Sequence, residues 1–320
     1  MKKELEKTIA QIKKEFGEES LVSLSGDSKK IESIPTGSYS LNEILGVGGI
    51  PKGRIIEIYG MESSGKTTLA LHITAEFQKL GGNVGYIDSE HALDPLYAKN
   101  IGVDVDNIIL SQPDSGEQAL QILQRFVESD KIKLIVVDSV ASLVPQAEID
   151  AEMGALKIGL QARLMSSALR KLVGIANKNK VTIIFINQIR IKIGAYGNPE
   201  TTPGGLALKF YSSVRIELRK KGTIKYREEP VGSNIKIKIA KSKVSAPFKT
   251  TEVQIIFNKG IDKLTDLANL LVKKEIIEKK GAWFFYKDYK WNGIKKVVIE
   301  LEDNKELKKE LLEIYGKLSS

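Results

Sequence analysis

The sequence predicts an α/β fold with a mostly parallel central sheet, an N-terminal helix and a small α+β domain at the C-terminus. Short apolar runs alternate with helical segments from Arg54 to Asn187, and strand-like runs follow one another without long helices after Asn187. Strands separated by helices form parallel βαβ units with helices on both sheet faces. The pattern changes again after residue 260. We therefore expect an N-terminal helix and linker at 1–30, a core at 31–260 and a C-terminal domain at 261–320.

The composition is that of a globular protein, with 42% hydrophobic and 28% charged residues among 320. The absence of cysteine excludes disulfides, zinc knuckles and thiol catalysis, and two histidines, His72 and His91, argue against a polyhistidine metal site. No apolar run reaches the ~18 residues that a membrane span needs, and residues 1–20 lack the apolar stretch of a signal peptide. We expect a cytoplasmic protein with no membrane partner.

The positive charge is concentrated in one part of the chain. The net charge is +9, and residues 190–250 contain fourteen Lys or Arg against four Asp or Glu. Such a block is typical of a surface that binds a polyanion such as nucleic acid, and equally of a solvated lysine-rich surface. Charge alone does not decide between these two interpretations.

The N-terminal segment predicts an amphipathic helix followed by a polar linker at 23–30. Four apolar residues recur at helical spacing within Met1–Glu19: Leu5, Ile9, Ile12 and Phe16. The apolar stripe of such a helix is buried either on its own domain or on a neighbouring copy of the chain. The pattern gives these two alternatives similar weight.

The remaining elements are predicted in chain order from apolar periodicity and length. The core strands are expected at Ile55–Tyr59, Val84–Asp88, Ile108–Ser111, Leu134–Asp138 and Val181–Asn187. The helices between them are expected at Lys66–Leu80, Glu117–Glu128 and Leu160–Asn177. Hairpins or an antiparallel extension are expected at Val214–Leu218, Ile235–Lys243 and Val253–Phe257. The C-terminal domain should contain a short helix with Leu264, Leu267 and Leu271, an aromatic run at Trp283–Tyr286 and a terminal helix near Asp303–Tyr315.

A glycine-rich turn follows the first predicted core strand and precedes a helix. Residues 60–67 read Gly-Met-Glu-Ser-Ser-Gly-Lys-Thr, which fits the phosphate-binding pattern G-x-x-x-x-G-K-[ST]. The glycines let backbone N–H groups point at phosphate oxygens, and the helix presents its positive end to the same anion. Lys66 is expected to reach the β- and γ-phosphates of ATP, and the Thr67 hydroxyl to bind Mg²⁺. The predicted nucleotide site comprises Gly60, Glu62, Ser63, Ser64, Gly65, Lys66, Thr67 and Thr68.

Three polar residues lie at or just after the carboxyl ends of predicted strands. Asp138 ends an apolar strand and is expected to hold Mg²⁺ through water. Glu90 follows the strand after the P-loop helix, and because that strand should lie close to the P-loop strand, Glu90 is a candidate for orienting or deprotonating water. The alternative is an acid near a helix N-terminus. Gln188 follows a further strand, where it is placed to sense the γ-phosphate.

Five longer stretches resemble bacterial RecA recombinases: residues 60–68, 86–95, 186–190, 197–202 and 207–211. The resemblance covers essentially the whole chain. It implies a RecA-like P-loop ATPase core and a helical homopolymer that forms on single-stranded DNA, pairs it with double-stranded DNA and hydrolyses ATP to reset the filament. It also implies a role in DNA repair and the SOS response, with a LexA-type repressor as a further partner.

The same resemblance implies a role for individual residues. Glu90 looks like the glutamate that activates water, and Gln188 looks like the glutamine that couples the γ-phosphate to DNA. Asp94 and Tyr97 match residues that contact adenine. Four further residues match positions at the contact between subunits: Lys241 and Lys243, which a neighbouring subunit inserts across ATP, and the interface residues Lys209 and Phe210. Physically, the leaving γ-phosphoryl group needs more cationic charge than Lys66 alone supplies.

Two stretches at about 148–158 and 189–206 correspond to the DNA-binding loops of this family. Arg163 and Arg170 follow the first loop and lie seven residues apart, so they share one face of a helix, and with Ser166 they match phosphate contacts. In the second loop, Lys192, Gly204 and Gly205 suit close approach to phosphates. Ile158 and Tyr196 occupy positions where the family wedges side chains between bases.

The chain departs from the family pattern in four places. The second loop is one residue shorter near Tyr196, and Pro203 and Leu206 stand where Thr and Asn are usual. The first loop has the less polar stretch 155–157, and the sequence ends at Ser320 without an acidic tail. The missing tail leads us to expect weaker autoinhibition of DNA capture, so removing the last dozen residues should not greatly increase duplex binding.

Two alternative functions belong to other classes. A ring-forming motor or helicase of the same core fold would close a ring and translocate, whereas a recombinase would grow long filaments. A coating protein that uses nucleotide only as structural glue would retain its ATPase activity, if any, after Glu90→Gln. The C-terminal domain is basic and aromatic and is expected to gather duplex DNA, with a simple structural cap as the alternative.

Overall fold

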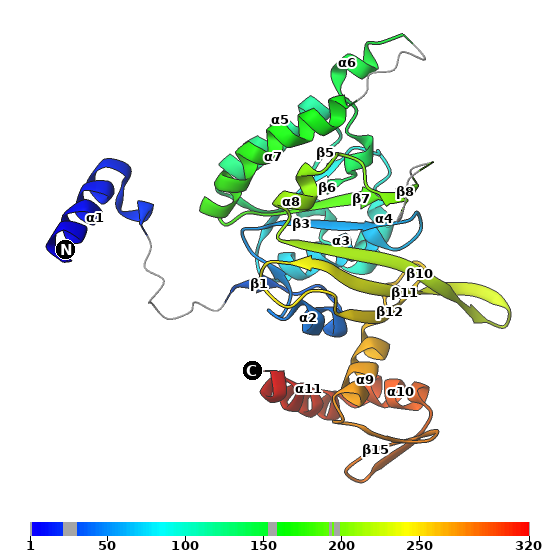
Figure 1. The fold of residues 1–320 in the computed structure, drawn as a ribbon. Coiled ribbons are helices and arrows are strands. Elements are labelled where there is room, and N and C mark those ends of the chain that lie inside the picture. The colour runs from blue at the N-terminus through cyan, green and yellow to red at the C-terminus, as the bar shows by residue number, and fades with distance from the viewer. Residues whose placement is uncertain (1, 22–30, 153–158, 192–193, 195–198, 320) are drawn as a thin grey trace. The chain divides into compact units, whose positions relative to one another are not determined.

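The computed structural model describes residues 2–21, 31–152, 159–191, 194 and 199–319 (Figure 1). The chain divides into two units, Met1–Glu32 and Ser33–Ser320. The first unit contains α1 (Lys2–Phe16) and a short 3₁₀ helix, η1 (Glu18–Ser20), which confirms the predicted N-terminal helix. Within this unit the apolar stripe of α1 is uncovered, since Leu5 and Phe16 are 61% and 69% exposed.

The second unit is built around a central sheet whose described strands run in the order β13-β12-β11-β10-β3-β7-β6-β4-β5. Neighbouring strands from β10 to β5 are parallel, and those from β13 to β10 are antiparallel. The mostly parallel sheet and its antiparallel extension are therefore confirmed. The strands are β3 (Ile55–Gly60), β4 (Asn83–Asp88), β5 (Ile108–Ser111), β6 (Ile132–Asp138), β7 (Thr182–Gln188), β10 (Val214–Tyr226), β11 (Glu229–Ser242), β12 (Thr250–Ile256) and β13 (Gly260–Ile261).

Helices cover both faces of this sheet, as the alternating pattern predicted (Figure 1). One apolar core lies between the sheet and α2 (Tyr39–Leu45), α3 (Lys66–Lys79) and α4 (Pro95–Ile101). The other lies between the sheet and α5 (Gly116–Glu128), α7 (Leu160–Lys178) and α8 (Ala207–Tyr211). The shorter elements are β1 (Ser33–Ile34), β2 (Ile50–Pro51), η2 (Val105–Asn107), η3 (Val140–Ser142), α6 (Gln146–Ile149), β8 (Arg190–Ile191) and β9 (Glu200–Thr201). Among the described residues, no helix is both long and apolar enough to cross a bilayer.

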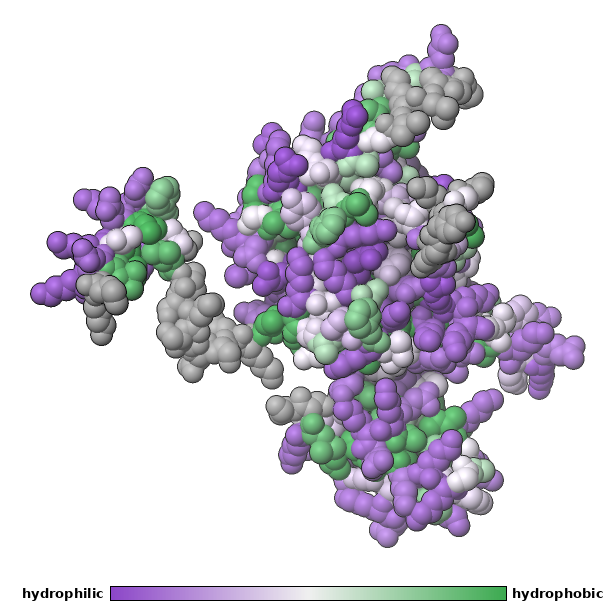
Figure 2. All heavy atoms as spheres, viewed as in Figure 1, coloured by the Kyte–Doolittle hydropathy of each residue, from purple (hydrophilic) through white to green (hydrophobic). Residues whose placement is uncertain are grey.

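Two expectations about strand placement need correction. We expected β4, which precedes Glu90, to lie close to the P-loop strand β3, but β7 and β6 lie between them. The strand predicted at Val214–Leu218 extends to Tyr226, and with β11 it forms a hairpin that projects beyond the domain (Figure 1). On the face seen in Figure 2, this projecting hairpin is covered mainly by hydrophilic side chains. Its polar outer half has no apolar alternation, which explains why the sequence did not reveal it.

The C-terminal part has an apolar core of its own around Leu267, Phe284, Trp291 and Leu301. Its elements are α9 (Lys263–Lys273), β14 (Glu278–Lys280), β15 (Trp283–Tyr286), β16 (Tyr289–Asn292), α10 (Ile294–Asp303) and α11 (Lys305–Ser319). The sequence predicted α9, the aromatic strand β15 and the last helix, but not α10. Because β13 pairs with β12, the central sheet continues to Ile261, and the C-terminal part begins with α9.

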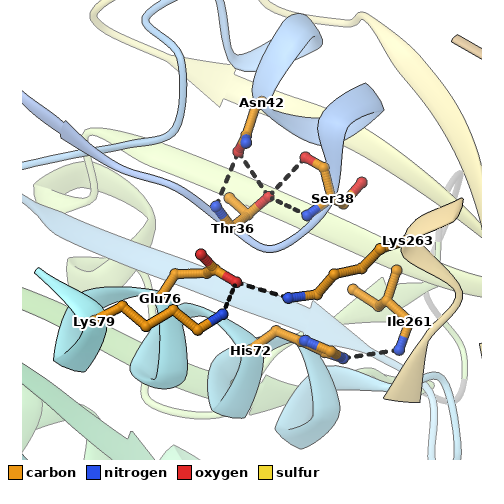
Figure 3. A network of polar contacts seen from close by, with 8 residues as sticks. All are labelled: Thr36, Ser38, Asn42, His72, Glu76, Lys79, Ile261 and Lys263. Atoms are coloured by element: carbon orange, nitrogen blue, oxygen red, sulfur yellow. Dashed lines mark hydrogen bonds and ion pairs between the residues drawn. The ribbon is translucent and has the colours of Figure 1, made fainter. Parts of the chain in front are cut away.

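Polar contacts join β13 and the start of α9 to the P-loop helix α3 at His72 and Glu76 (Figure 3). The buried His72 Nε2 accepts a hydrogen bond of 2.8 Å from the Ile261 N–H, and burial lowers the pKa of His72 to about 3. The neutral imidazole is therefore the form that holds this bond. Glu76, one turn further along α3, accepts hydrogen bonds from Lys263 at 2.6 Å and Lys79 at 2.9 Å. These contacts connect β13 and the first residue of α9 to the helix that starts at the P-loop.

A buried carboxylate makes a second attachment between the two parts. Asp266 on α9 is 3% exposed and accepts hydrogen bonds from the Ser38 hydroxyl at 2.8 Å, and from both the hydroxyl and the N–H of Ser40. Burial raises the pKa of Asp266, although the hydrogen bonds from Ser40 and Ser38 act in the opposite direction. The Ser38 side chain also caps α2, so a single polar cluster joins α2 to α9.

Candidate functional site

The glycine-rich turn joins β3 to α3 at the carboxyl edge of the sheet, where the sequence placed it. Gly65 is the N-cap of α3, with a left-handed φ of 85°. A Cβ atom at Gly65 would lie 2.3 Å from Ile255 Cδ1, and one at Gly60 would lie 2.3 Å from the Leu218 carbonyl oxygen. A side chain at Gly60 would clash with backbone, whereas one at Gly65 would displace the end of the Ile255 side chain and adopt a left-handed conformation, so the fold of the loop favours glycine at both positions.

We expect Gly65→Ala to weaken nucleotide binding by about 5- to 150-fold, since a left-handed non-glycine residue costs on the order of 1–3 kcal/mol. The clash with Ile255 adds to this backbone strain. Titration with a fluorescent ATP analogue measures the effect, and Gly81→Ala is the matched control. Gly81 also has a positive φ, 78°, but its Cβ would meet nothing within 4 Å. Equal nucleotide affinities in the two variants would contradict our explanation.

The polar side chains of the loop are arranged around the start of α3. Lys66 Nζ donates a hydrogen bond of 2.8 Å to the Met61 carbonyl across the loop, and burial lowers the pKa of Lys66. Ser64 Oγ is buried and has no hydrogen-bond partner among the described residues. The first N–H groups of α3 have no partner within the helix, as in any helix. A donor-rich loop with a lysine and an unsatisfied hydroxyl fits a bound polyphosphate.

Asp138 ends β6 and faces the start of α3. Its Oδ2 accepts hydrogen bonds from the Thr67 hydroxyl at 2.7 Å and from the Tyr86 hydroxyl at 3.0 Å. Burial raises the pKa of Asp138 to about 6, and the two hydroxyl groups oppose that increase. The sequence predicted Thr67 and Asp138 as partners at a metal, and the structure brings them into direct contact. A hydroxyl and a carboxylate are the ligand types that Mg²⁺ uses in such sites.

Glu90 lies on the same edge although β4 is distant from β3 in the sheet. Its Oε1 accepts hydrogen bonds from the hydroxyls of Ser139 and Ser142, the second at 3.3 Å, and from Gln188 Nε2 at 3.1 Å. Gln188 is opposite Gly60 in the β3–β7 register. Glu90 therefore sits beside the P-loop because Gln188 and the turn after β6 hold it there, and not because its own strand adjoins β3.

The segment after Glu90 is anchored by caps and hydroxyl contacts. Asp94 caps α4 by accepting hydrogen bonds from the N–H groups of Leu96 at 2.8 Å and Tyr97 at 3.2 Å. The Tyr97 hydroxyl contacts the Thr68 hydroxyl at 2.7 Å. Tyr97, on α4, thus contacts the first turn of the P-loop helix α3, and its contact with adenine stays a prediction. The structure gives Asp94 a capping role as well.

The predicted lysine pair lies together with the predicted interface residues. Lys241 Nζ donates hydrogen bonds to the carbonyls of Lys209 at 2.6 Å and Phe210 at 2.9 Å, and Lys243 Nζ donates to the Phe210 carbonyl at 3.2 Å. Burial, with the positive charges of Lys243 and Arg215 nearby, lowers the pKa of Lys241. The Phe210 ring is 68% exposed. Cations and an exposed aromatic ring therefore share one surface.

This lysine pair is remote from the P-loop of its own chain. Arg215 pairs with Lys241 on one side and with Glu57 on the other, which is three residues before Gly60. That offset is roughly 10 Å along the strand, and two strand spacings add roughly 10 Å across the sheet. The ammonium groups are held by α8 carbonyls, so the pair does not belong to its own chain's nucleotide site.

The predicted DNA-binding residues fall into two groups. Arg163 and Arg170 are exposed on α7 and Ser166 is half-buried there, in agreement with one helix face. Ile158, Lys192 and Tyr196 lie outside the described residues. Gly204 and Gly205 have left-handed φ values of 83° and 74°, and Cβ atoms there would approach Val140 Cγ1 to 2.9 Å and Ala162 Cβ to 2.8 Å. Close packing against α7 and η3 is thus a reason for glycine here that the sequence did not suggest.

Four residues of the site escaped the sequence analysis, namely Tyr86, Ser139, Ser142 and Asn187, and so did Gln161, which lies outside the site and contacts the turn after β6. Ser139 had a detectable signal, because it directly follows Asp138 at the same strand end. Tyr86 reads as an apolar strand residue, and Gln161 as one polar residue in an amphipathic helix. Asn187 bonds Glu57 at 3.0 Å and the Pro203 carbonyl at 3.1 Å, a link that only the fold reveals.

A P-loop between a parallel strand and a helix, opposite a strand-ending carboxylate, defines a P-loop ATPase core of the α/β class. Residues 3–262 match the RecA N-terminal domain family. The chain is similar to proteins named Protein RecA from Mycoplasmopsis pulmonis (52% identical, covering 97% of this chain and 92% of that one) and Fusobacterium nucleatum (56%, covering 95% and 82%). A protein of that name from Campylobacter hominis is 54% identical, with 97% of this chain and 90% of that one covered.

The chain belongs to the RecA family. This family acts in homologous recombination and DNA repair, and that is the function of this chain. Family membership also makes it a protein that binds nucleotide and DNA and associates with copies of itself. A ring-forming motor is not favoured.

Proposed function

We propose that this chain polymerises on single-stranded DNA in the presence of ATP, pairs that strand with homologous duplex DNA and exchanges strands. One observation carries the proposal most directly: Gln188 donates a hydrogen bond to Glu90 and also begins the predicted second DNA loop. The next residue, Ile189, donates its N–H to the Gly60 carbonyl of the P-loop at 3.1 Å. Hydrogen bonds therefore connect the start of the predicted DNA loop both to the P-loop and to the candidate base.

Each residue of the nucleotide site has a separate proposed role that follows from its side-chain chemistry. The P-loop amides and Lys66 would neutralise the phosphates of ATP, and Thr67 with Asp138 would hold Mg²⁺, directly and through water respectively. Glu90 would orient or deprotonate the attacking water. When bound, Mg²⁺ would neutralise part of the negative charge of the phosphates.

The neighbouring protomer would complete this site. Lys241 and Lys243 lie with the exposed Phe210 on a face remote from their own P-loop. A repeated head-to-tail contact that does not close produces a helical filament, in which each lysine pair would reach the next chain's ATP. The uncovered apolar stripe of α1 would add a second contact to an adjacent copy.

DNA would bind along the face that carries the two loops and α7, with Arg163, Ser166 and Arg170 on the backbone phosphates. The C-terminal part would gather duplex DNA. Its small sheet combines cations with aromatic rings: Lys290 Nζ lies 4.5 Å from the Trp283 ring centroid and Lys280 Nζ 5.8 Å from that of Phe285. A filament of this kind would also offer a groove in which a LexA-type repressor cleaves itself.

The proposed function predicts ATP-dependent and homology-dependent D-loop formation by the purified protein. Strand exchange replaces base pairs by similar base pairs, so the filament need only hold one strand extended for a correct match to close. We expect joint molecules with ATP and a homologous supercoiled duplex. ADP, or a heterologous duplex of equal length and superhelicity, should yield none. Closed rings on single-stranded DNA, with strand separation in place of D-loops, would support the motor instead.

A further inference from the structure

The turn after β6 holds Glu90 through two hydroxyl groups. The hydroxyl groups of Ser139 and Ser142 both donate hydrogen bonds to Glu90 Oε1. Ser139 directly precedes the 3₁₀ turn η3, and Ser142 is its last residue. The candidate base thus depends on the conformation of residues 139–143 as well as on Gln188. The carbonyl groups of this same turn accept hydrogen bonds from one side chain on α7.

That side chain is Gln161, in the first turn of α7, three residues beyond the predicted first DNA loop. Its Nε2 donates hydrogen bonds to the carbonyls of Val140 at 2.9 Å and Leu143 at 3.2 Å, with the Ala141 carbonyl at 3.4 Å. Its Oε1 accepts the N–H of Gly204 in the predicted second DNA loop at 3.2 Å. One amide group therefore links Gly204 of the predicted second DNA loop to the turn that holds Glu90.

Packing makes these contacts stiff. A Cβ atom at Gly204 would stand 2.9 Å from Val140 Cγ1 and 3.5 Å from Met165 Cγ, and one at Gly205 would stand 2.8 Å from Ala162 Cβ. The backbone of 204–205 therefore lies directly on η3 and the first turn of α7. A displacement of residues 204–205 must move the turn or break the Gln161 hydrogen bonds.

We infer that Gln161 is a positioning residue that couples the second DNA loop and the start of α7 to Glu90 through the turn 139–143, in parallel with Gln188. This inference rests on the proposed function. DNA that moves Gly204 or the start of α7 shifts the turn, and the hydroxyls of Ser139 and Ser142 then change the orientation of the Glu90 carboxylate. The coupling uses two discrete contacts, the Gln161 amide and the paired hydroxyls, each of which can be removed separately.

The test measures ATP hydrolysis by the full chain with and without single-stranded DNA at one fixed salt concentration, since DNA affinity depends steeply on salt. For Gln161→Ala we expect the stimulation by DNA to fall about 5- to 50-fold, in the range of coupling between sites. Nucleotide affinity, DNA-free hydrolysis and DNA affinity should change less than about twofold, because the nucleotide and phosphate contacts remain. Gln124→Ala is the matched control: Gln124 lies on α5, and its side-chain Nε2 donates a hydrogen bond of 2.7 Å to Glu128, away from the turn and both predicted loops.

Two further variants separate the coupling from a folding effect. Gln161→Glu keeps an acceptor for the Gly204 N–H but loses the donors to the turn, so it should lose stimulation as Gln161→Ala does. Ser142→Ala removes one hydroxyl from Glu90, and because it acts on the same route, the double variant Gln161→Ala/Ser142→Ala should be no worse than the more impaired single variant.

Several outcomes would overturn the inference. Full stimulation in Gln161→Ala, multiplied losses in the double variant, or an equal loss of DNA-free hydrolysis would each assign Gln161 a purely structural role or none. If Gln161→Ala does not fold, Gln161→Glu and Ser142→Ala still test whether Gln161 couples DNA binding to Glu90. Failure of the unaltered chain to show any DNA-stimulated hydrolysis would count against the proposed function, and not against the coupling as such.

Discussion

We expect Glu90→Gln to reduce DNA-stimulated ATP hydrolysis by about 10²- to 10⁴-fold, the usual contribution of a general base. The substitution replaces a carboxylate by an amide of almost the same shape. Its oxygen still accepts hydrogen bonds from Ser139 and Ser142, so the turn after β6 should stay in place. Nucleotide binding and filament growth should therefore persist. Phosphate release at saturating ATP, together with nucleotide titration and electron microscopy of filaments, measures each of these separately.

The matched control for this experiment is Glu128→Gln, an exposed acid on α5 whose described contact is with Gln124. It should hydrolyse ATP at the normal rate. A Glu90→Gln variant that retained activity within about twofold would show that Glu90 is not the base. In that case its contacts with Ser139 and Gln188 would be structural, and the coating-protein alternative would gain support. Stable filaments without turnover would instead show that assembly needs ATP and that disassembly needs hydrolysis.

The core of the fold was predictable from local signals because strand, turn and helix each carry their own pattern. Residues 55–80 contain an apolar run, a P-loop and a helix in sequence, and the observed β3 and α3 begin at the predicted residues. The order of the strands in the sheet was harder to predict. The position of β4 is set by its pairing with β6 and β5, and this pairing joins segments far apart in the sequence. The outer half of the β10–β11 hairpin turns at Arg227 and Glu228, both with positive φ. Such turns usually contain Asn or Gly, so this one left no recognisable signal.

The candidate site was predictable where the chemistry of the ligand requires one particular type of side chain. Lys66, Thr67 and Asp138 fall into place because phosphate and Mg²⁺ demand those side chains at those strand ends. Glu90 was chosen for a partly wrong reason: its strand is not close to β3, and the side chain reaches the site through contacts with Ser139, Ser142 and Gln188. Contacts of this kind join residues about 50 to 100 positions apart. No local pattern in a single sequence encodes them.

The lysine pair offers the sharpest test of how the ATP site is shared between chains. We expect Lys241→Ala to reduce ATP hydrolysis about 10²- to 10³-fold, as removal of one group that stabilises developing charge usually does. Nucleotide binding by the isolated chain should be unaffected, because Lys241 contacts α8 and not its own P-loop. The control is Lys131→Ala, an exposed lysine before β6.

Mixing two inactive variants decides whether the lysine acts on its own chain or on the next. Lys66→Ala lacks the P-loop cation but keeps Lys241, whereas Lys241→Ala keeps its P-loop. In randomly mixed filaments, an active interface forms where the P-loop of a Lys241→Ala chain meets the lysines of a Lys66→Ala chain. With equal amounts this applies to about a quarter of the interfaces, since each of the two positions is filled correctly half the time.

Hydrolysis by the mixture is therefore expected to recover to roughly a quarter of the unaltered rate, although each variant alone is inactive. A site in which the lysine served its own nucleotide would show no recovery at any ratio, because no chain would then hold both cations. Recovery that peaks at equal amounts and falls toward either pure variant would place each ATP between successive protomers. The same geometry links hydrolysis to assembly, because a chain without a neighbour lacks the second cation and keeps its ATP.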